Sequence, residues 1–144
     1  MVKPDKIFKK IYDITPQFVK DNNIKGLLVD MDNTLLPWHD TKLSRESLDW
    51  LKMMIQNGVN ICVITNSGNE RTSKVMENTG FEYIHTAFKP FPFSFIKAKR
   101  KLQVKKENIY VVGDQMVTDV LGSKIAGLKC ILVDPISPKE QKGT

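Results

Sequence analysis

Residues 26–34 read Gly-Leu-Leu-Val-Asp-Met-Asp-Asn-Thr, an apolar run that ends in two carboxylates two positions apart. The apolar part predicts a strand, and in an extended segment the side chains at i and i+2 point the same way. Asp30 and Asp32 are therefore predicted to converge on one ligand. Because neighbouring carboxylates repel each other unless a cation or a proton lies with them, the stretch indicates chemistry on a phosphate.

Apolar runs alternate with segments of helical periodicity along the rest of the chain. The pattern predicts strands at 26–29, 59–64, 83–85, 109–112 and 130–133, and helices at 45–56, 69–78, 92–102 and 115–126. Ser44 is a candidate N-cap and Gly127 a candidate helix stop. Repeated strand–helix alternation with short connections predicts parallel strands. The predicted fold is α/β, a doubly wound three-layer sandwich around a parallel five-stranded sheet.

Polar residues follow the predicted strands at the ends where such folds bind ligands. In doubly wound sheets the site lies beyond the carboxyl ends of the strands, where the strand order reverses. The residues at such ends are Asp30, Asp32, Thr65, Asn66, Lys89 and Asp114. Their shared position is stronger evidence for a site than any one of them.

The composition is typical of a globular protein of one domain. The chain has 144 residues, of which 41% are hydrophobic and 26% charged, enough to bury roughly two thirds of the unfolded surface. No apolar run approaches the roughly 20 residues that span a bilayer, and lysines interrupt the first apolar residues, unlike in a signal peptide. Cys62 and Cys130 lie in apolar runs, which predicts buried free thiols in a reducing cytoplasm.

Positive charge is the other feature of the composition. The net charge of +6 favours an anionic substrate or partner, or else is a solvated basic face. Residues 1–23 form a basic amphipathic lead, which we expect to pack on the core, with a membrane-surface contact as the alternative. Its apolar residues recur at helical spacing: Ile7, Phe8, Ile11 and Ile14. The basic run at 97–106 is either a solvated face or a contact for anionic membrane or RNA, and residues 137–144 are a polar tail.

Four motifs in order resemble those of the haloacid dehalogenase (HAD) superfamily of phosphatases. They are Asp30-Met31-Asp32-Asn33-Thr34, then Thr65-Asn66, then Lys89-Pro90, then Gly113-Asp114 with Asp119. The first and last, with Pro37-Trp38, are similar to the YqeG group of subfamily IIIA, which is related to the phosphatidylglycerophosphate phosphatases. The resemblance covers essentially the whole chain. Each motif alone is a weak signal, but all four in order at strand ends are a strong one.

The resemblance implies phosphomonoester hydrolysis through an aspartyl phosphate on Asp30. It implies Mg²⁺, a hard cation that prefers oxygen ligands, bound by the carboxylates of Asp30 and Asp114, the backbone carbonyl of Asp32 and waters. Asp32 would protonate the leaving alkoxide and then take a proton from the attacking water.

Further residues are expected to support this chemistry. Thr65 would donate its hydroxyl to a phosphoryl oxygen, and Lys89 would neutralise the phosphoryl oxygens and shield the carboxylates from one another. Asp119 would support the metal through water or orient Lys89. The remaining candidates for substrate contact are Asn33, Thr34, Asn66 and Ser67, of which the first two are also expected to hold the loop.

The short spacing between motifs leaves no room for a cap domain, only for a small flap at 35–43. An uncapped site is open to large substrates, so we expect a bulky or lipid-linked phosphomonoester such as phosphatidylglycerophosphate. The alternative is a binding or assembly factor that contacts RNA, the ribosome or an anionic membrane through its basic face. A phosphoacceptor signalling domain is disfavoured, because the third predicted strand ends near His85 without an aspartate. The expected location is cytoplasmic, with peripheral contact at the membrane left open.

Overall fold

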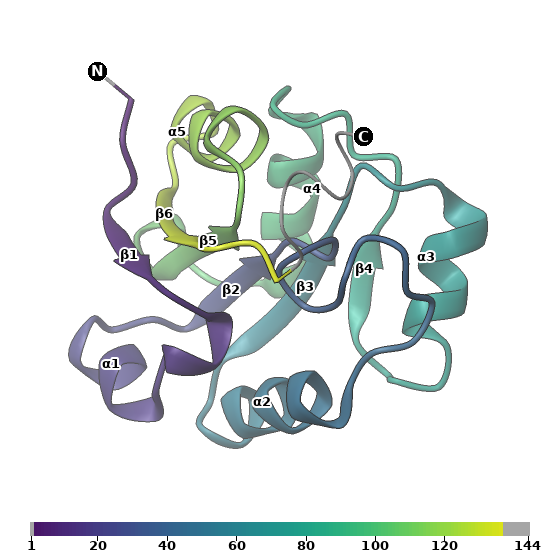
Figure 1. Cartoon of the computed structure of the whole chain (residues 1–144). Coiled ribbons are helices and arrows are strands. Elements are labelled where there is room, and N and C mark those ends of the chain that lie inside the picture. Colours follow the sequence, from purple (N-terminus) through teal and green to yellow (C-terminus); the bar gives the residue numbers. More distant parts are fainter. Residues whose placement is uncertain (1, 137–144) are drawn as a thin grey trace.

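A six-stranded parallel sheet forms the centre of the molecule (Figure 1). The computed structural model describes residues 2–136. The strands are β1 (Lys6–Phe8), β2 (Gly26–Val29), β3 (Asn60–Ile64), β4 (Glu82–Ile84), β5 (Ile109–Gly113) and β6 (Lys129–Val133). Their order is β1-β6-β5-β2-β3-β4, and every pairing is parallel. The order reverses between β2 and β5, which is the place where ligands bind in such sheets.

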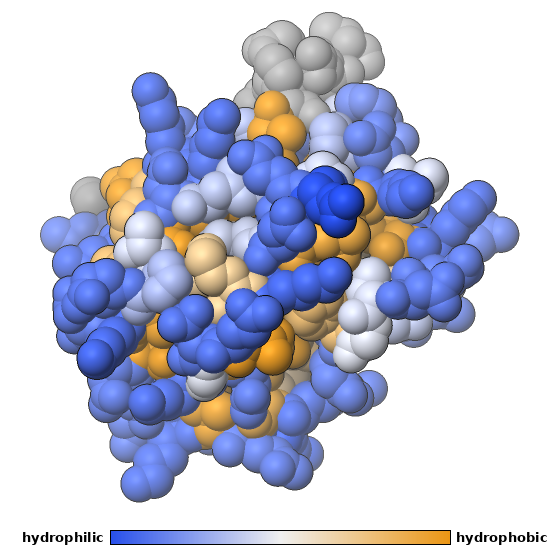
Figure 2. Space-filling model, turned by 90° about the horizontal axis from the view of Figure 1, so that it is seen from below, coloured by the Kyte–Doolittle hydropathy of each residue, from blue (hydrophilic) through white to orange (hydrophobic). Residues whose placement is uncertain are grey.

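Helices cover both faces of the sheet, so that the molecule has three layers. The helices are α1 (Pro16–Asp21), α2 (Arg45–Gln56), α3 (Asn69–Met76), α4 (Phe93–Leu102) and α5 (Gly122–Ile125). Apolar side chains of α1, α2 and α3 form one core, and those of α4 and the segment before α5 form the other. Strand β2 is buried throughout because it contributes to both cores. Seen from the side of α1 and α2, the surface is mostly hydrophilic with apolar areas between (Figure 2).

The predicted doubly wound α/β fold is confirmed, and β1 is an addition to the five predicted strands. In the lead, β1 pairs with β6 at the sheet edge and only α1 is α-helical. Ile11 and Ile14 are buried in the core, whereas Ile7 is exposed on the outer edge. The helical spacing of these apolar residues therefore does not reflect one continuous helix. The predicted polar tail at 137–144 lies outside the described residues.

The predicted helix at 115–126 has a different geometry. Residues Met116–Leu121 form a π-helical segment, and the short α5 follows it. The amide of Val120 donates to the carbonyl of Gln115, five residues earlier, at 3.2 Å. Such widened turns occur often at functional sites, and this one directs Asp119 inward, as described below.

The connections around the predicted site are short. Residues 35–43, between β2 and α2, form an irregular flap without a helix or strand of their own. Among residues 2–136 no helix has the length and apolar character to cross a membrane. Cys62 and Cys130 are buried and free, as the sequence predicted.

Helix α4 offers a matched test of the packing. Phe95 is fully buried, whereas Phe93 is 72% exposed on the first turn of the same helix. Phe95→Ala should lower the free energy of unfolding by about 3–5 kcal/mol, because it removes apolar contacts and leaves a cavity. Phe93→Ala should change it by less than about 0.5 kcal/mol. Urea denaturation measures both, and equal losses in the two variants would contradict this packing.

Candidate active site

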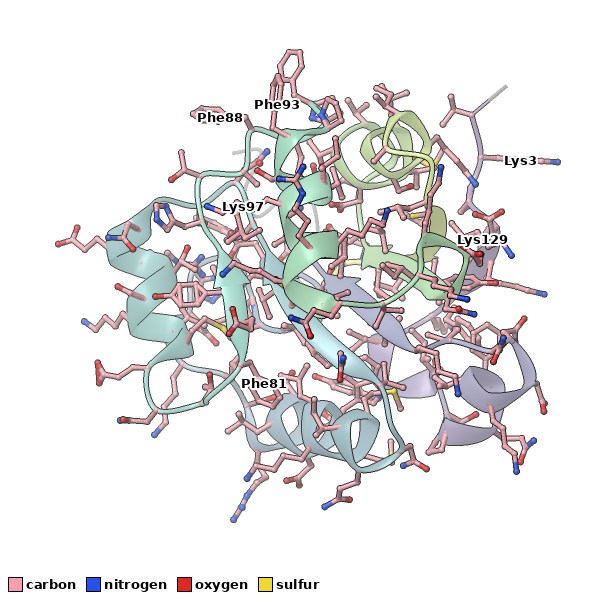
Figure 3. All side chains as sticks on the ribbon, turned by 180° about the vertical axis from the view of Figure 1, so that it is seen from behind. Lys3, Phe81, Phe88, Phe93, Lys97 and Lys129 are labelled. Carbon is pink, nitrogen blue, oxygen red and sulfur yellow. The ribbon has the colours of Figure 1, made fainter. Side chains whose placement is uncertain are left out.

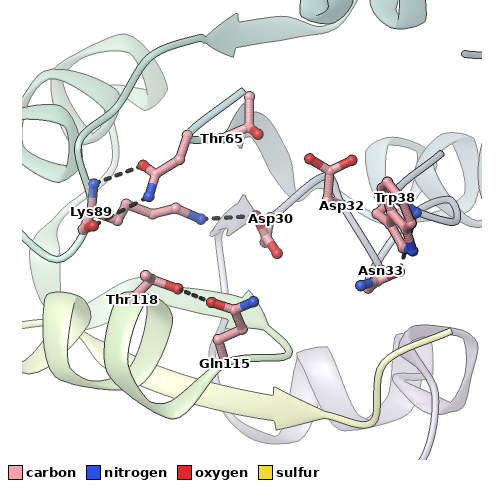
Figure 4. Close-up of a pocket in the computed structure, with 9 residues that line it drawn as sticks. Asp30, Asp32, Asn33, Trp38, Thr65, Lys89, Gln115 and Thr118 are labelled. Atoms are coloured by element: carbon pink, nitrogen blue, oxygen red, sulfur yellow. Dashed lines mark hydrogen bonds and ion pairs between the residues drawn. The ribbon is translucent and has the colours of Figure 1, made fainter. Parts of the chain in front are cut away.

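A pocket lies beyond the carboxyl ends of the central strands, where the strand order reverses. Its lining residues are Asp30, Asp32, Asn33, Trp38, Thr65, Asn66, Lys89, Gln115 and Thr118. In Figure 4, Lys89 reaches Asp30 from one side, and Asp32 and Trp38 lie on the other. The structure thus brings the motifs after β2, β3, β4 and β5 to one place. Gln115 and Thr118, which hydrogen-bond each other at 3.0 Å, had not been predicted as site residues.

The ammonium of Lys89 is the buried centre of the site. Its Nζ donates to Asp30 Oδ1 at 2.8 Å and to Asp119 Oδ1 at 2.7 Å. A third donation goes to the carbonyl of Ile64, at the end of β3, at 3.2 Å. Since an ammonium has three protons, this buried charge has its full set of partners. Lys89 therefore orders Asp30 and Asp119 on either side of it.

The loop that carries Lys89 is held by one side chain from the β3 end. The amide oxygen of Asn66 accepts from the Lys89 backbone N–H at 2.7 Å, and its amide nitrogen donates to the Lys89 carbonyl at 3.2 Å. Next to it, the hydroxyl of Thr65 accepts from the Ser67 N–H at 3.1 Å. A hydroxyl that accepts still has its own proton to donate, so Thr65 can donate into the pocket.

Asp119 reaches Lys89 because Gly113 leaves space. A Cβ added at Gly113 would lie 2.3 Å from Oδ2 of Asp119, closer than any real contact. That same Oδ2 accepts from the Gln115 N–H at 3.1 Å. Glycine at the end of β5 and the π-helical segment after it together let a buried carboxylate lie against the sheet. This explains the glycine of the Gly113-Asp114 motif in physical terms.

Burial governs the ionisation of the cluster. It raises the pKa of Asp30 to about 7, with Lys89 opposing the rise and Asp114 adding to it. Burial likewise raises the pKa of Asp119 to about 6, with the charge of Asp30 adding to the rise and Lys89 opposing it. Burial alone would lower the pKa of Lys89, but Asp119 and Asp30 raise it above its ordinary value. The carboxylates therefore carry excess negative charge that a proton or a bound cation offsets.

Asp32 is held by a residue that sequence reasoning missed. Arg71, in the first turn of α3, places Nη1 2.5 Å from Asp32 Oδ1, and Ser67 donates its hydroxyl to Asp32 Oδ2 at 2.8 Å. Nη2 of Arg71 also donates to the carbonyl of Asp40 at 2.6 Å. Arg71 thereby connects Asp32 to the flap. A cation in the first turn of a helix is unfavourable with the helix dipole, which is the one signal that could have drawn attention to it.

The loop after β2 is shaped by Asn33. This residue has a positive φ of 62°, and its backbone N–H donates to the carbonyl of Leu36. Its side-chain oxygen accepts from the Trp38 N–H at 3.1 Å. The turn places Trp38 in the pocket lining, with 38% of its surface exposed. Trp38 is therefore free to contact a substrate at the mouth.

Two predicted substrate contacts lie behind the pocket rather than in its lining. Thr34 is buried, and its hydroxyl is 3.4 Å from Asp30 Oδ2 and 3.4 Å from Asp114 Oδ1. Ser67 donates to Asp32, as described above. Both side chains contact carboxylates of the site, so their position fits holding those groups rather than touching a ligand.

Three carboxylates form a candidate metal site. Asp30, Asp114 and Asp119 each offer one oxygen, and these oxygens lie within 4.8 Å of one another. An all-oxygen donor set suits a hard divalent cation. Both oxygens of Asp119 accept hydrogen bonds from fixed donors, at 2.7 Å from Lys89 and 3.1 Å from the Gln115 N–H. The hydrogen bond to Asp30 Oδ2 is longer, 3.4 Å from the Thr34 hydroxyl, so this oxygen is better suited to direct contact with a cation. The carboxylate of Asp32 is outside the group.

Comparisons with known proteins identify the class to which this sheet and its acidic cluster belong. A family model described as HAD-hydrolase-like matches residues 87–135. "Probable phosphatase YqeG" of Bacillus subtilis (strain 168) is 35% identical over 137 residues, which cover 95% of this chain and 80% of that protein. The chain therefore belongs to the HAD-type phosphatases, in the family that includes this relative.

Solved structures share the fold. An uncharacterized protein from Listeria monocytogenes serotype 4b aligns with a TM-score of 0.62 and 22% identity, over 76% of this chain and 78% of that chain. The 3-deoxy-D-manno-octulosonate 8-phosphate phosphatase from Moraxella catarrhalis aligns with a TM-score of 0.55 and 16% identity, over 72% of this chain and 63% of that one. At these identities the likeness concerns the fold alone.

The raised pKa values predict an unusual pH dependence of stability in EDTA. Asp30 and Asp119 have folded-state pKa values of about 7 and about 6, above the ordinary 3.8. The folded state then binds more protons than the unfolded state between about pH 4 and pH 7, so the free energy of unfolding should fall as pH rises through that window. The loss approaches about 1.4 kcal/mol for each unit of raised pKa. Urea denaturation at pH 4.5 and 7.5 measures it.

The control for this prediction is Asp30→Asn, which removes the main titrating group but keeps the shape of the side chain. Its stability should change less with pH over the same range than that of the wild type. Stability that rises between pH 4.5 and 7.5, or an unchanged slope in Asp30→Asn, would contradict the assigned ionisation.

Proposed function

We propose that the chain is a Mg²⁺-dependent phosphomonoester hydrolase that acts through an aspartyl phosphate on Asp30, with a bulky or lipid-linked substrate. The observation that carries this proposal is the contact of Lys89 with both Asp30 and Asp119 at the base of the pocket. A phosphate dianion and an anionic nucleophile repel each other, so hydrolysis needs positive charge beside the nucleophile. Lys89 supplies such a charge next to Asp30.

Asp30 and Asp114 would hold the Mg²⁺ ion by their carboxylates, with the backbone carbonyl of Asp32 as a further ligand. When bound, the ion supplies Lewis-acid stabilisation of the charge on the phosphoryl oxygens. Asp119 then has the role of a positioning residue, because its carboxylate is engaged by Lys89 and the Gln115 amide. Of the two roles that the sequence offered for Asp119, we therefore propose that it orients Lys89.

The first half-reaction uses two carboxyl groups. A carboxylate oxygen of Asp30 attacks phosphorus, the ester P–O bond breaks, and Asp32 gives its proton to the leaving alkoxide. Thr65 donates its hydroxyl to a phosphoryl oxygen. In the second half-reaction Asp32 takes a proton from water, whose oxygen attacks phosphorus, and the bond to Asp30 breaks to release phosphate. Arg71 and Ser67 hold Asp32 in place. Because both donate to its carboxylate, Asp32 has to take up a proton from solvent before the first half-reaction, and the proton that it takes from water in the second half-reaction restores this form.

The size of the pocket favours a substrate that extends beyond it. The cavity has a volume of about 230 Å³, below the roughly 300–1,000 Å³ of pockets that enclose a drug-sized ligand. It therefore accommodates the phosphorylated end of a substrate, and the remainder would lie outside, near Trp38 at the mouth. Phosphatidylglycerophosphate is the candidate that the family resemblance suggests. The alternative role, an assembly factor for RNA or ribosome, rests only on the exposed basic run of α4 and its following loop.

Burst kinetics with p-nitrophenyl phosphate test the roles of the two aspartates. Asp30→Asn should abolish both burst and turnover, because no covalent intermediate forms. Asp32→Asn should still release about one nitrophenolate per enzyme, because that leaving group needs little protonation. Its turnover should then fall by roughly 10²–10⁴-fold, since the attacking water has lost its base. Stopped-flow absorbance measures both phases.

The matched control is Asp49→Asn, which changes an exposed carboxylate on α2 and should leave both phases unchanged. Wild-type turnover should stop in EDTA and return with Mg²⁺. Turnover above a tenth of the wild-type rate in Asp30→Asn, or full activity in EDTA, would refute the proposed reaction.

A further inference from the structure

Exposed apolar side chains gather beside the pocket. Single exposed apolar residues are normal on a protein surface, but a group of them indicates an interaction site. Half of the large apolar residues that are exposed in the described chain come from two short segments: Phe88, Phe91, Phe93, Ile96, Met116 and Val117. We call this set the apolar rim. Figure 3 shows Phe88 and Phe93 projecting from the same edge of the molecule.

The two segments of the rim are neighbours in space and both flank the pocket. A Cβ placed on Gly122, just after the π-helical segment, would lie 3.2 Å from the α-carbon of Pro90. Phe88 directly precedes Lys89, and Met116 and Val117 lie between Gln115 and Thr118, which line the pocket with it. The two segments that carry the rim therefore also supply lining residues of the pocket.

The surroundings of the rim are positively charged. Between Glu82 and Glu107 every charged residue is a lysine or an arginine, with His85 counted as neutral. Lys97 and Arg100 are exposed one and two turns after Phe93 on α4. Figure 3 shows Lys97 on the same helix, further from the edge. Apolar side chains at an edge with cations behind them match the layers of a membrane surface, where hydrocarbon lies beneath anionic headgroups.

We propose that the apolar rim docks on an anionic lipid bilayer and presents the pocket to phosphates at the headgroup level. Half of the rim, Met116, Val117 and Ile96, has no flat face for stacking on bases. A hydrocarbon layer takes these side chains and the three phenylalanines alike, which favours a bilayer over single-stranded nucleic acid. A second copy of the chain would bring two basic α4 helices together, and their charges would repel. The inference deepens the proposed function and rests on it for its purpose, but docking itself needs no catalysis.

Vesicle flotation tests the docking with lipids that carry no phosphomonoester. The intact chain is mixed with vesicles of phosphatidylcholine alone or of phosphatidylcholine with 30% phosphatidylglycerol. The wild type should float with the anionic vesicles, and 0.5 M NaCl should weaken that binding because it screens the charges. The double variant Phe91→Ser/Phe93→Ser should bind at least tenfold more weakly. Ile55→Ser, which changes an exposed apolar residue on α2, should bind like the wild type.

Two further measurements keep docking and catalysis separate. Hydrolysis of p-nitrophenyl phosphate without vesicles should be equal in wild type and double variant, so that lost flotation reflects the rim and not the fold. Failure of the wild type to float with anionic vesicles at low salt would overturn the docking, whatever its phosphatase activity. The proposal would also be overturned if the double variant still floated but lost a binding to single-stranded RNA that the wild type shows. It would equally be overturned if the double variant still floated but lost a dimer that the wild type forms in sedimentation.

Discussion

The ammonium of Lys89 lies between the buried carboxylates of Asp30 and Asp119, and the rest of the site is arranged around this contact. Taking three charges out of water is costly unless each finds close partners. Lys89 meets that requirement with two carboxylates and the carbonyl of Ile64. Asn66 fixes the Lys89 backbone on both sides, and Gly113 gives Asp119 room to approach. Several features of the sheet edge thus serve a single buried cation.

A second contact extends this order to the flap. Arg71 holds Asp32 with one guanidinium nitrogen and the carbonyl of Asp40 with another. The flap that carries Trp38 is therefore connected to the group to which we assign proton transfer. In this way the rigid sheet ends position Asp30, whereas a helix and a loop position Asp32. Such a division suits a site that is open on one side and orients the bulky substrate that we propose.

The sequence predicted what depends on local pattern and failed where distant residues decide. Buried strands and their polar ends are visible in the order of residues, which is why Asp30, Lys89 and the doubly wound sheet could be predicted. Strand β1 has three residues and exists because it pairs with β6, a contact between the two ends of the chain. The π-helical segment likewise follows from Asp119 lying over Gly113, which periodicity does not encode. Arg71 was missed because only its long side chain reaches the site.

The most direct test of the central contact is a crystal structure grown with Mg²⁺ and beryllofluoride, which mimics a phosphoryl group on an aspartate. We predict beryllofluoride bonded to Asp30, the metal bound by the carboxylates of Asp30 and Asp114, and Lys89 still within hydrogen-bond distance of Asp119. Beryllofluoride on another residue, or Lys89 turned away from Asp30 and Asp119, would contradict the account.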